Sequence, residues 1–240
     1  MTQLLLSACG IEHSFGDGPS AVIVLKGIDI DILSGEVLML VGPSGSGKTT
    51  LIHILGQLLR PTAGSIAVCG EPAEALDEDG LAALRLRYFG FIFQAHNLFP
   101  MLSATENVMV ALDLLGVRGE TARYRARALL AAVGLDHRRD AYPSQLSIGQ
   151  RQRVAIARAL AADPAILIAD EPTASLDSEN GLKAMELLRA LARRSRRAVV
   201  IVTHDHRIFD FADRILHLED GRIVSDVQEA SNPTVAGTKS

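Results

Sequence analysis

The sequence predicts an α/β fold, in which helices cover a mostly parallel β-sheet. Short apolar runs at residues 37–41, 165–169 and 198–202 have the length and composition of strands buried on both faces. Between them lie longer segments whose apolar residues recur at helical spacing, such as residues 50–59. The chain has 240 residues, 48% of them hydrophobic, which suffices for one large domain with a full core.

The first of these runs leads into the most informative stretch. Residues 42–49 read Gly-Pro-Ser-Gly-Ser-Gly-Lys-Thr and match the P-loop spacing G-x-x-x-x-G-K-[ST] at every fixed position. Glycines let backbone N–H groups approach phosphate oxygens, and the following helix adds the positive end of its dipole. The strand before and the helix after make an ordinary glycine-rich turn the weaker interpretation. The residues predicted to contact a nucleotide are Gly42, Ser44, Gly45, Gly47, Lys48, Thr49 and Thr50.

Antiparallel strands are predicted at both ends of the chain. Residues 3–32 alternate polar and apolar positions around a Gly-Asp-Gly-Pro turn, which indicates an antiparallel pair at the sheet edge. Residues 215–224 predict a hairpin around Asp220 and Gly221. Phe15, just before the first turn, has two open interpretations, because an aromatic ring there fits the core or a stack on an adenine ring equally well.

Polar residues follow the predicted core strands. Asp170 and Glu171 end one apolar run, and in a chain with a P-loop this matches a Walker B strand, whose first acid serves Mg²⁺ and whose second polarises water. Gln94 and His204 end two other runs. Ligands of open α/β sheets bind at these carboxyl ends. Taken singly, however, such a glutamine or histidine is more often structural.

Residues 103–162 are predicted to be helical, like a subdomain inserted into the α/β core. Ser103-x-x-Glu106 is a capping box, and so is Ser147-x-x-Gln150 at the start of a later helix. A helix N-terminus that carries a hydroxyl and a glycine is also an anion site. The local residues therefore leave a well-capped helix and an anion site equally open.

Composition argues against several classes of function. A net charge of −4 gives no general attraction to nucleic acid, and the basic cluster at residues 193–197 is interpreted as a solvated helix end. Cys9 and Cys69 have neither metal-ligand nor disulfide spacing, which predicts reduced thiols. No run approaches the ~18 apolar residues that a membrane span needs. Any role at a membrane is therefore expected to be peripheral.

The motifs in order resemble the nucleotide-binding subunits of ABC transporters over about residues 3–224. The order is P-loop, Gln94, Leu-Ser-Ile-Gly-Gln at residues 146–150, Walker B with Glu171, Asp177 and His204. The sequence around Gln94 and His204 most resembles the exporter branch that serves lipoprotein release, macrolide export and DevA-type glycolipid export.

This resemblance implies a role for each residue. Lys48, Glu171 and His204 would be catalytic, with Glu171 as the base that acts on the attacking water and His204 in contact with the γ-phosphate. Two copies would associate head to tail, so that the signature of one closes over ATP bound by the other. The expected cofactors are ATP and Mg²⁺. The resemblance assigns the metal to Thr49, Gln94 and Asp170, and assigns nucleotide contacts beyond the P-loop to Phe15, Gln94, Ser147, Gly149, Gln150 and Asp177.

Two positions depart from the family pattern. Phe15 replaces the more usual tyrosine, which keeps stacking and loses a hydroxyl. Ile148 stands where many members have glycine. If Ser147 and Gly149 make the phosphate contacts, a side chain between them is tolerated when it points away. A weakened signature is the alternative.

The implied organisation is a P-loop NTPase (RecA-like) core with an antiparallel β edge and an inserted helical subdomain that carries the signature. Residues 1–224 would form one ABC ATPase domain, with the helical subdomain at about residues 95–162 and a polar, frayed tail at 225–240. The resemblance further implies export through a separate integral-membrane permease, at the cytoplasmic face of the inner membrane. A periplasmic adaptor and an outer-membrane channel are further candidate partners, and nucleic acid is not expected.

Two other functions compete with this interpretation. A soluble ABC ATPase that acts on nucleic acid or ribosomes would usually carry tandem cassettes or a long coiled-coil insertion. This chain has one P-loop, one signature and no sustained heptad. A small-molecule P-loop kinase would need neither the signature stretch nor His204.

Overall fold

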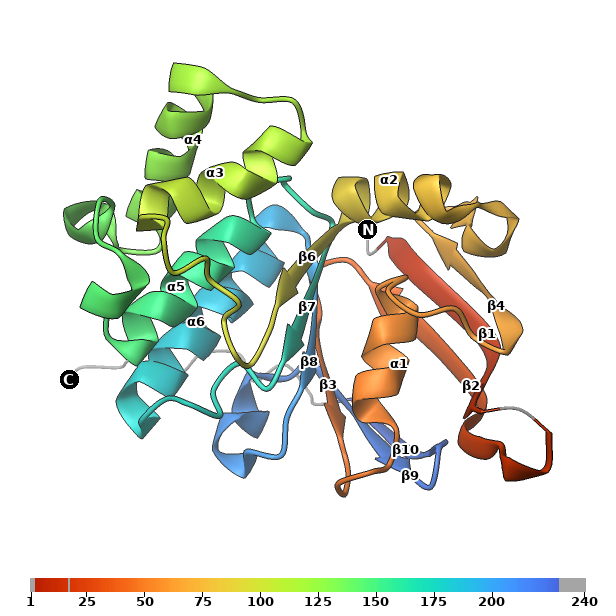
Figure 1. Cartoon of the computed structure of the whole chain (residues 1–240). Helices are drawn as coiled ribbons and strands as arrows, with labels where there is room; N and C mark the ends of the chain where they lie inside the picture. The colour runs from red at the N-terminus through yellow and green to blue at the C-terminus, as the bar shows by residue number, and fades with distance from the viewer. Residues whose placement is uncertain (1–2, 17, 229–240) are drawn as a thin grey trace, which may run out of the picture.

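The computed structural model describes residues 3–16 and 18–228. They form two sheets, which lie on either side of the first α-helix of the chain (Figure 1). The larger sheet has the order β10-β9-β3-β8-β7-β6. Strands β9, β3, β8, β7 and β6 run parallel, and β10 runs antiparallel to β9. Their bounds are β3 (Val37–Val41), β6 (Phe89–Ile92), β7 (Ile166–Asp170), β8 (Ala198–Val202), β9 (Arg214–Glu219) and β10 (Arg222–Gln228).

The smaller sheet is antiparallel, with the order β2-β1-β4-β5. The predicted pairing within residues 3–32 is confirmed, because β1 and β2 run side by side from Leu4 opposite Leu33 to Phe15 opposite Val22. This pair belongs to a sheet of its own rather than to the edge of the parallel sheet. The strands are β1 (Leu4–Phe15), β2 (Val22–Leu33), β4 (Ala63–Val68) and β5 (Glu71–Pro72).

The central strand β3 separates two apolar cores. Val37, Met39 and Val41 pack with the helices of one side, whereas Leu38 and Leu40 pack with α1 (Lys48–Leu55) and the antiparallel sheet. Successive side chains of a strand point to opposite faces. A strand with a core on each face must therefore be apolar at every position, as residues 37–41 are.

The helices lie in two groups (Figure 1). Helix α1 (Lys48–Leu55) lies between the sheets, and α2 (Glu78–Tyr88) packs near β6. Helices α3 (Ala104–Leu114), α4 (Gly119–Ala132) and α5 (Ile148–Ala159) pack against one another, and α6 (Ser178–Ser195) packs against α5 and β8. Within the described part of the chain, no helix has the length and apolar character needed to cross a membrane. Short 3-10 helices occupy Gly18–Ser20, Ala73–Ala75, Asp136–Arg138, Pro143–Gln145 and His206–Phe211.

Helix α1 ends four residues before its predicted end at residue 59. Gly56 packs so closely that a Cβ there would lie 2.6 Å from the Phe91 ring, and Gln57 adopts a left-handed conformation with φ of 59°. Leu58, one of the apolar residues at helical spacing within residues 50–59, is exposed. The close approach of β6 to the helix therefore turns the chain earlier than its apolar spacing predicts.

Strand β10 is longer than predicted. Beyond Val224 it continues through Gln228, which pairs with Arg214 of β9. Arg214 also donates hydrogen bonds of 2.7 and 2.6 Å to the two carboxylate oxygens of Asp226. The prediction of a frayed tail from residue 225 is therefore wrong for residues 225–228, and the rest of that tail lies outside the described residues.

Candidate functional site

A cavity of about 610 Å³ opens where the P-loop meets the carboxyl ends of the parallel strands. Strand β3 leads into the P-loop, β6 toward Gln94, β7 into Asp170 and Glu171, and β8 toward His204. Because parallel strands end at the same edge of a sheet, residues far apart in the sequence meet there. The cavity is lined by Phe15, Val24, Gly42, Ser44, Gly45, Gly47, Lys48, Thr49, Thr50, Gln94, Asp170, Glu171, Val202 and His204.

Gly42, Gly45 and Gly47 of the P-loop all have a positive φ, which favours glycine. Gly42 has φ of 146°, and a Cβ there would lie 2.0 Å from the carbonyl oxygen of Leu218. Gly47 has φ of 101° and caps α1, and in the part of the chain that the structure describes no side chain forms a hydrogen bond at this cap. The first N–H groups of a helix have no partner within the helix. At α1 no capping side chain competes for them, which suits the binding of phosphate oxygens.

Lys48, the first residue of α1, lies inside the curve of the P-loop. Its ammonium group donates hydrogen bonds of 2.9 Å to the carbonyl of Gly42 and 2.7 Å to that of Pro43. Burial lowers the pKa of Lys48, while the nearby Glu171 and Asp170 carboxylates oppose that shift. The loop thus holds a positive charge beside the N-terminus of a helix.

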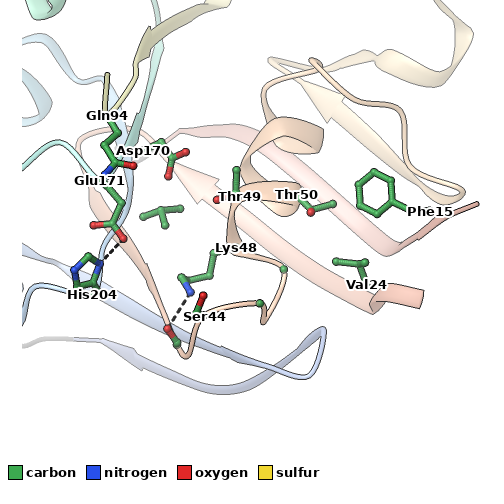
Figure 2. A pocket seen from close by; sticks show the side chains of 14 residues that line it. Phe15, Val24, Ser44, Lys48, Thr49, Thr50, Gln94, Asp170, Glu171 and His204 are labelled. Carbon is green, nitrogen blue, oxygen red and sulfur yellow. Dashed lines mark hydrogen bonds and ion pairs between the residues drawn. The ribbon is translucent and has the colours of Figure 1, made fainter. Parts of the chain in front are cut away.

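Two acids at the end of β7 face the P-loop across the cavity (Figure 2). Burial raises the pKa of Asp170, and the nearby His53 is the largest of the charges that oppose the shift. A partly buried carboxylate of this kind is favoured by a nearby cation. Together with the Thr49 hydroxyl and the Gln94 amide, Asp170 supplies the hard oxygen donors that Mg²⁺ prefers.

These donors fit Mg²⁺ rather than a metal held by protein ligands alone. Among residues 3–16 and 18–228, no group of three or more His, Cys, Asp or Glu side chains is arranged to hold a metal ion. Mg²⁺ is commonly bound by one or two protein oxygens together with substrate phosphates and water. The residues present are therefore compatible with a metal that arrives with a phosphate ligand.

Glu171 and His204 form a pair across the ends of β7 and β8. The His204 Nδ1 atom lies 2.7 Å from one carboxylate oxygen of Glu171, while the other oxygen is buried and has no hydrogen-bond partner among the described residues. Glu171 has φ of 48°, and its backbone N–H donates to the carbonyl of Val202 at 2.9 Å. A left-handed conformation in a residue other than glycine is often found at functional sites. The pair presents an acid and an imidazole to the cavity.

Phe15 lies at the end of the cavity away from Glu171 and His204. The residue is 50% exposed, which excludes a core position and favours the stacking interpretation. The His13 ring packs edge-on against it, with ring centroids 4.6 Å apart and an angle of 81° between the planes. Val24 lies near Phe15 on the same side of the cavity (Figure 2). This apolar end suits a flat aromatic base.

The signature residues do not line this cavity. Ser147 caps α5 and forms the predicted capping box with Gln150. Asp177 caps α6, and hydrogen bonds from Asn180 lower its pKa. A Cβ at Gly149 would lie 3.1 Å from the Asn180 side chain, so the starts of α5 and α6 are in contact. Ser147, Gly149, Gln150 and Asp177 thus form a second cluster, separate from the P-loop cavity.

The middle residue of the signature, Ile148, lies at the first position of α5. The Ile148 side chain is 43% exposed, whereas Gly149 packs against Asn180. A side chain is therefore accommodated at residue 148, whereas a Cβ at residue 149 would lie 3.1 Å from the Asn180 side chain and would require that side chain to shift. Within one chain, Ile148 disturbs neither the cap nor the helix.

Some residues of the site carried no sequence signal. Val24 and Val202 line the cavity but belong to strands whose apolar residues look like core. Asn180 touches Gly149 from a different helix. Its position three residues after Asp177 indicates a helix cap but does not indicate this contact.

Comparisons with known proteins agree on one family. A family profile described as ABC transporter matches residues 25–174. A macrolide export ATP-binding/permease protein, MacB 1 of Aeromonas hydrophila subsp. hydrophila, is 46% identical over 241 residues, covering 100% of this chain and 37% of that protein. MacB of Salmonella typhi is 46% identical over 92% of this chain and 34% of its own length. The chain thus spans about a third of the curated relatives it matches.

Solved structures support the same fold. The ATP-binding cassette MJ0796, described as a dimer in a post-hydrolysis state bound to ADP and Pi, has a TM-score of 0.85 and 39% identity, covering 93% of this chain and 98% of that chain. CbiO1 of Clostridium perfringens, part of the ABC transporter complex CbiONQ, has a TM-score of 0.85 and 30% identity, covering 94% and 88%. The predicted fold class is therefore confirmed.

Proposed function

The chain belongs to the ABC transporter family, and from this premise we propose that it binds and hydrolyses ATP to power export through an integral-membrane permease. Family membership confirms the predicted ABC transporter ATPase, while the exporter role is taken from the relatives named for macrolide export. The main observation behind the proposal is that one cavity is lined by an uncapped helix N-terminus, a lysine, two adjacent acids and a half-exposed aromatic ring.

In this proposal each end of the cavity binds one part of ATP. The Phe15 ring stacks on the adenine, and the phosphates bind the P-loop from Gly42 to Thr50. Lys48 contributes charge-assisted hydrogen bonds to the β- and γ-phosphates. Thr49, Asp170 and Gln94 hold Mg²⁺, which when bound neutralises charge on the phosphates.

Glu171 acts on the attacking water. Its carboxylate accepts the proton of the water or orients it toward the γ-phosphate, as a general base. His204 holds one oxygen of Glu171 and contacts the γ-phosphate. The second oxygen of Glu171 is buried and without a hydrogen-bond partner among the described residues, so the carboxylate must turn for this oxygen to accept from the water.

A second copy of the chain completes the site. Ser147, Gly149 and Gln150 lie outside the cavity of their own chain, so they act on ATP bound by the other copy, with Asp177 beside them. A head-to-tail homodimer then encloses two ATP molecules. The similar cassette MJ0796 is described as a dimer, which supports a dimeric assembly here.

We place the permease contact in a groove of about 470 Å³ between α2, β6, α3 and α5. Its lining is mainly apolar and includes Phe91, Phe93, Phe99 and Leu114, with Arg158 at one wall. The occupant is a cytoplasmic segment of the permease, whether that permease is a separate protein, as the sequence predicts, or part of a longer chain, as the relatives' names indicate. The chain then works at the cytoplasmic face of the inner membrane, where a periplasmic adaptor and an outer-membrane channel are further candidate partners.

The domain limits belong to the same proposal. The predicted domain of residues 1–224 extends to the end of β10 at Gln228, and residues 95–162 are its helical subdomain. The mutual packing of α3, α4 and α5 supports such a unit.

The test combines hydrolysis with capture of the partner. Glu171→Gln is expected to lower ATP turnover at least about 100-fold, because a general base contributes on the order of 10²–10⁴, while ATP binding is kept. The tagged variant is then used with ATP to recover partners from detergent-solubilised membranes of the host, and Lys48→Ala, whose ATP affinity is expected to be strongly reduced, serves as the control at an ATP concentration too low to occupy it. An integral-membrane protein recovered only with Glu171→Gln supports the exporter. Recovery of ribosomes or nucleic acid without a permease supports the soluble ABC ATPase instead, and wild-type turnover by Glu171→Gln contradicts the role of Glu171.

A further inference from the structure

The loop that follows Gln94 has an unusual backbone. His96 and Asn97 are consecutive left-handed residues, with φ of 61° and 48°. Within the loop, the N–H of His96 donates to the carbonyl of Phe93 at 2.9 Å and that of Asn97 to Ala95 at 2.7 Å. Residues other than glycine adopt this conformation uncommonly, although histidine and asparagine do so more readily than most, and two in succession need support from surrounding contacts. The contacts that hold this loop should therefore matter to the position of Gln94.

One of these contacts comes from the far end of α5. The Arg158 guanidinium donates from Nη1 to the carbonyl of Asn97 at 2.5 Å and from Nη2 to the carbonyl of His96 at 2.7 Å. Burial lowers the pKa of Arg158, and within the described residues no carboxylate forms an ion pair with it. A guanidinium presents its donors as a rigid planar fork. Its partly buried charge is thus used to hold two adjacent backbone carbonyls.

The rest of the segment is held by α3. The fully buried Asn107 accepts from the N–H of Phe99 at 2.8 Å and donates to the carbonyls of Phe99, Leu102 and Ser103 at 3.1, 2.9 and 3.0 Å. Residues 96–103 are therefore attached to the helical subdomain at both ends. The connection back to the parallel sheet passes through the short stretch that contains Gln94.

Arg158 occupies a position where three parts of the molecule meet. It lies on the same helix as the signature, which starts at Ser147. It holds the loop that follows Gln94, and together with Asn97 it lines the apolar groove. We propose that Arg158 is a positioning residue that fixes the loop after Gln94 to the signature helix, so that Gln94 and Ser147 move together when the groove is occupied. This inference rests on the proposed function for what the movement controls.

The first experiment measures the loop itself in the full chain. Amide hydrogen exchange of residues 95–97 is expected to be about tenfold faster in Arg158→Gln than in the wild type, with exchange inside α5 unchanged. Arg158→Lys is expected to lie between the two, because one ammonium group cannot reproduce the two-pronged contact. Arg153→Gln is the matched control, since Arg153 lies on the same helix and makes no hydrogen bond to residues 94–103 among those described. Unchanged exchange at residues 95–97, or an equal increase along α5, would overturn the proposal.

The second experiment separates positioning from nucleotide binding. ATP affinity at equilibrium is expected to stay within about twofold of wild type in Arg158→Gln, while turnover falls about tenfold, with partial recovery in Arg158→Lys. A loss of turnover as large in Arg153→Gln would contradict the proposal. If Arg158→Gln fails to fold, the same comparison is made with Arg158→Lys, and a wild-type value for both exchange and turnover would refute it. Failure of the wild-type chain to hydrolyse ATP would overturn the proposed function instead, and the exchange experiment would still test the contact.

Discussion

Two helix N-termini of this chain, those of α1 and α5, are expected to contact phosphate, and they differ in how they are capped. The N-cap of helix α1 is Gly47, which has a left-handed conformation. Because no side chain among the described residues caps this helix, its first N–H groups are left for a ligand. Helix α5 starts at Ser147, whose hydroxyl accepts from the N–H of Gln150, while the Gln150 side chain accepts from the N–H of Ser147. The first terminus is open, and the second already satisfies two of its own N–H groups.

This difference indicates that the two termini act at different steps of ATP binding. An N-terminus without a cap gives all its donors to phosphate, and at α1 Lys48 adds a full charge. A capped N-terminus is stable alone, since such a cap contributes about 1 kcal/mol, and has less to offer an anion. We expect ATP to bind the P-loop of one copy first and the signature of the other copy second. Three substitutions test this order.

The largest effect is expected at the open terminus. Lys48→Ala removes hydrogen bonds to the β- and γ-phosphates that contribute about 1.5–3 kcal/mol each, which corresponds to a loss of at least about 100-fold in ATP affinity. Titration calorimetry with ATP and Mg²⁺ measures this loss, and thermal unfolding without ATP checks that the variant is folded. Unchanged affinity would contradict the role of the P-loop.

An intermediate effect is expected at the capped terminus, where Ser147→Asp separates the cap from the phosphate contact. Aspartate is also a good helix cap, so unfolding is expected to be nearly unchanged. Its carboxylate would repel the triphosphate held by the partner chain, so dimerisation with ATP should fall about tenfold or more, with monomer ATP affinity within about twofold. Light scattering of a Glu171→Gln background measures the dimer. Undiminished dimerisation by Ser147→Asp would place the signature away from the phosphates.

The smallest effect is expected at Ile148. Because its side chain is exposed and Gly149 makes the close contact with Asn180, Ile148→Gly should change turnover by less than about threefold. The variant should also lose up to about 0.5 kcal/mol of stability, because glycine is a poorer helix residue. Gly149→Ala is the matched comparison and should be more harmful, since its Cβ would press on Asn180. A gain in turnover of tenfold or more in Ile148→Gly would mean that Ile148 weakens the signature.

Local sequence predicted those features that depend on nearby residues. The P-loop, the buried strands and both capping boxes follow from spacing and cap chemistry within ten residues, and the structure contains each of them. The early end of α1 was missed because it depends on Phe91, which lies far along the chain from Gly56. The extra length of β10 was missed because it depends on its pairing with β9 and on Asp226 beside Arg214.

The sequence by itself determined the fold class, the order of the motifs and the chemistry of each motif, because these depend on residue type and short spacing. Tertiary structure decided how the motifs are grouped. Strand order brought Gln94, Glu171 and His204 to one cavity with Lys48, and it left Ser147 outside. It also exposed Phe15 and joined Arg158 to the loop after Gln94. Contacts of this kind join segments separated by tens of residues, and no local pattern specifies them.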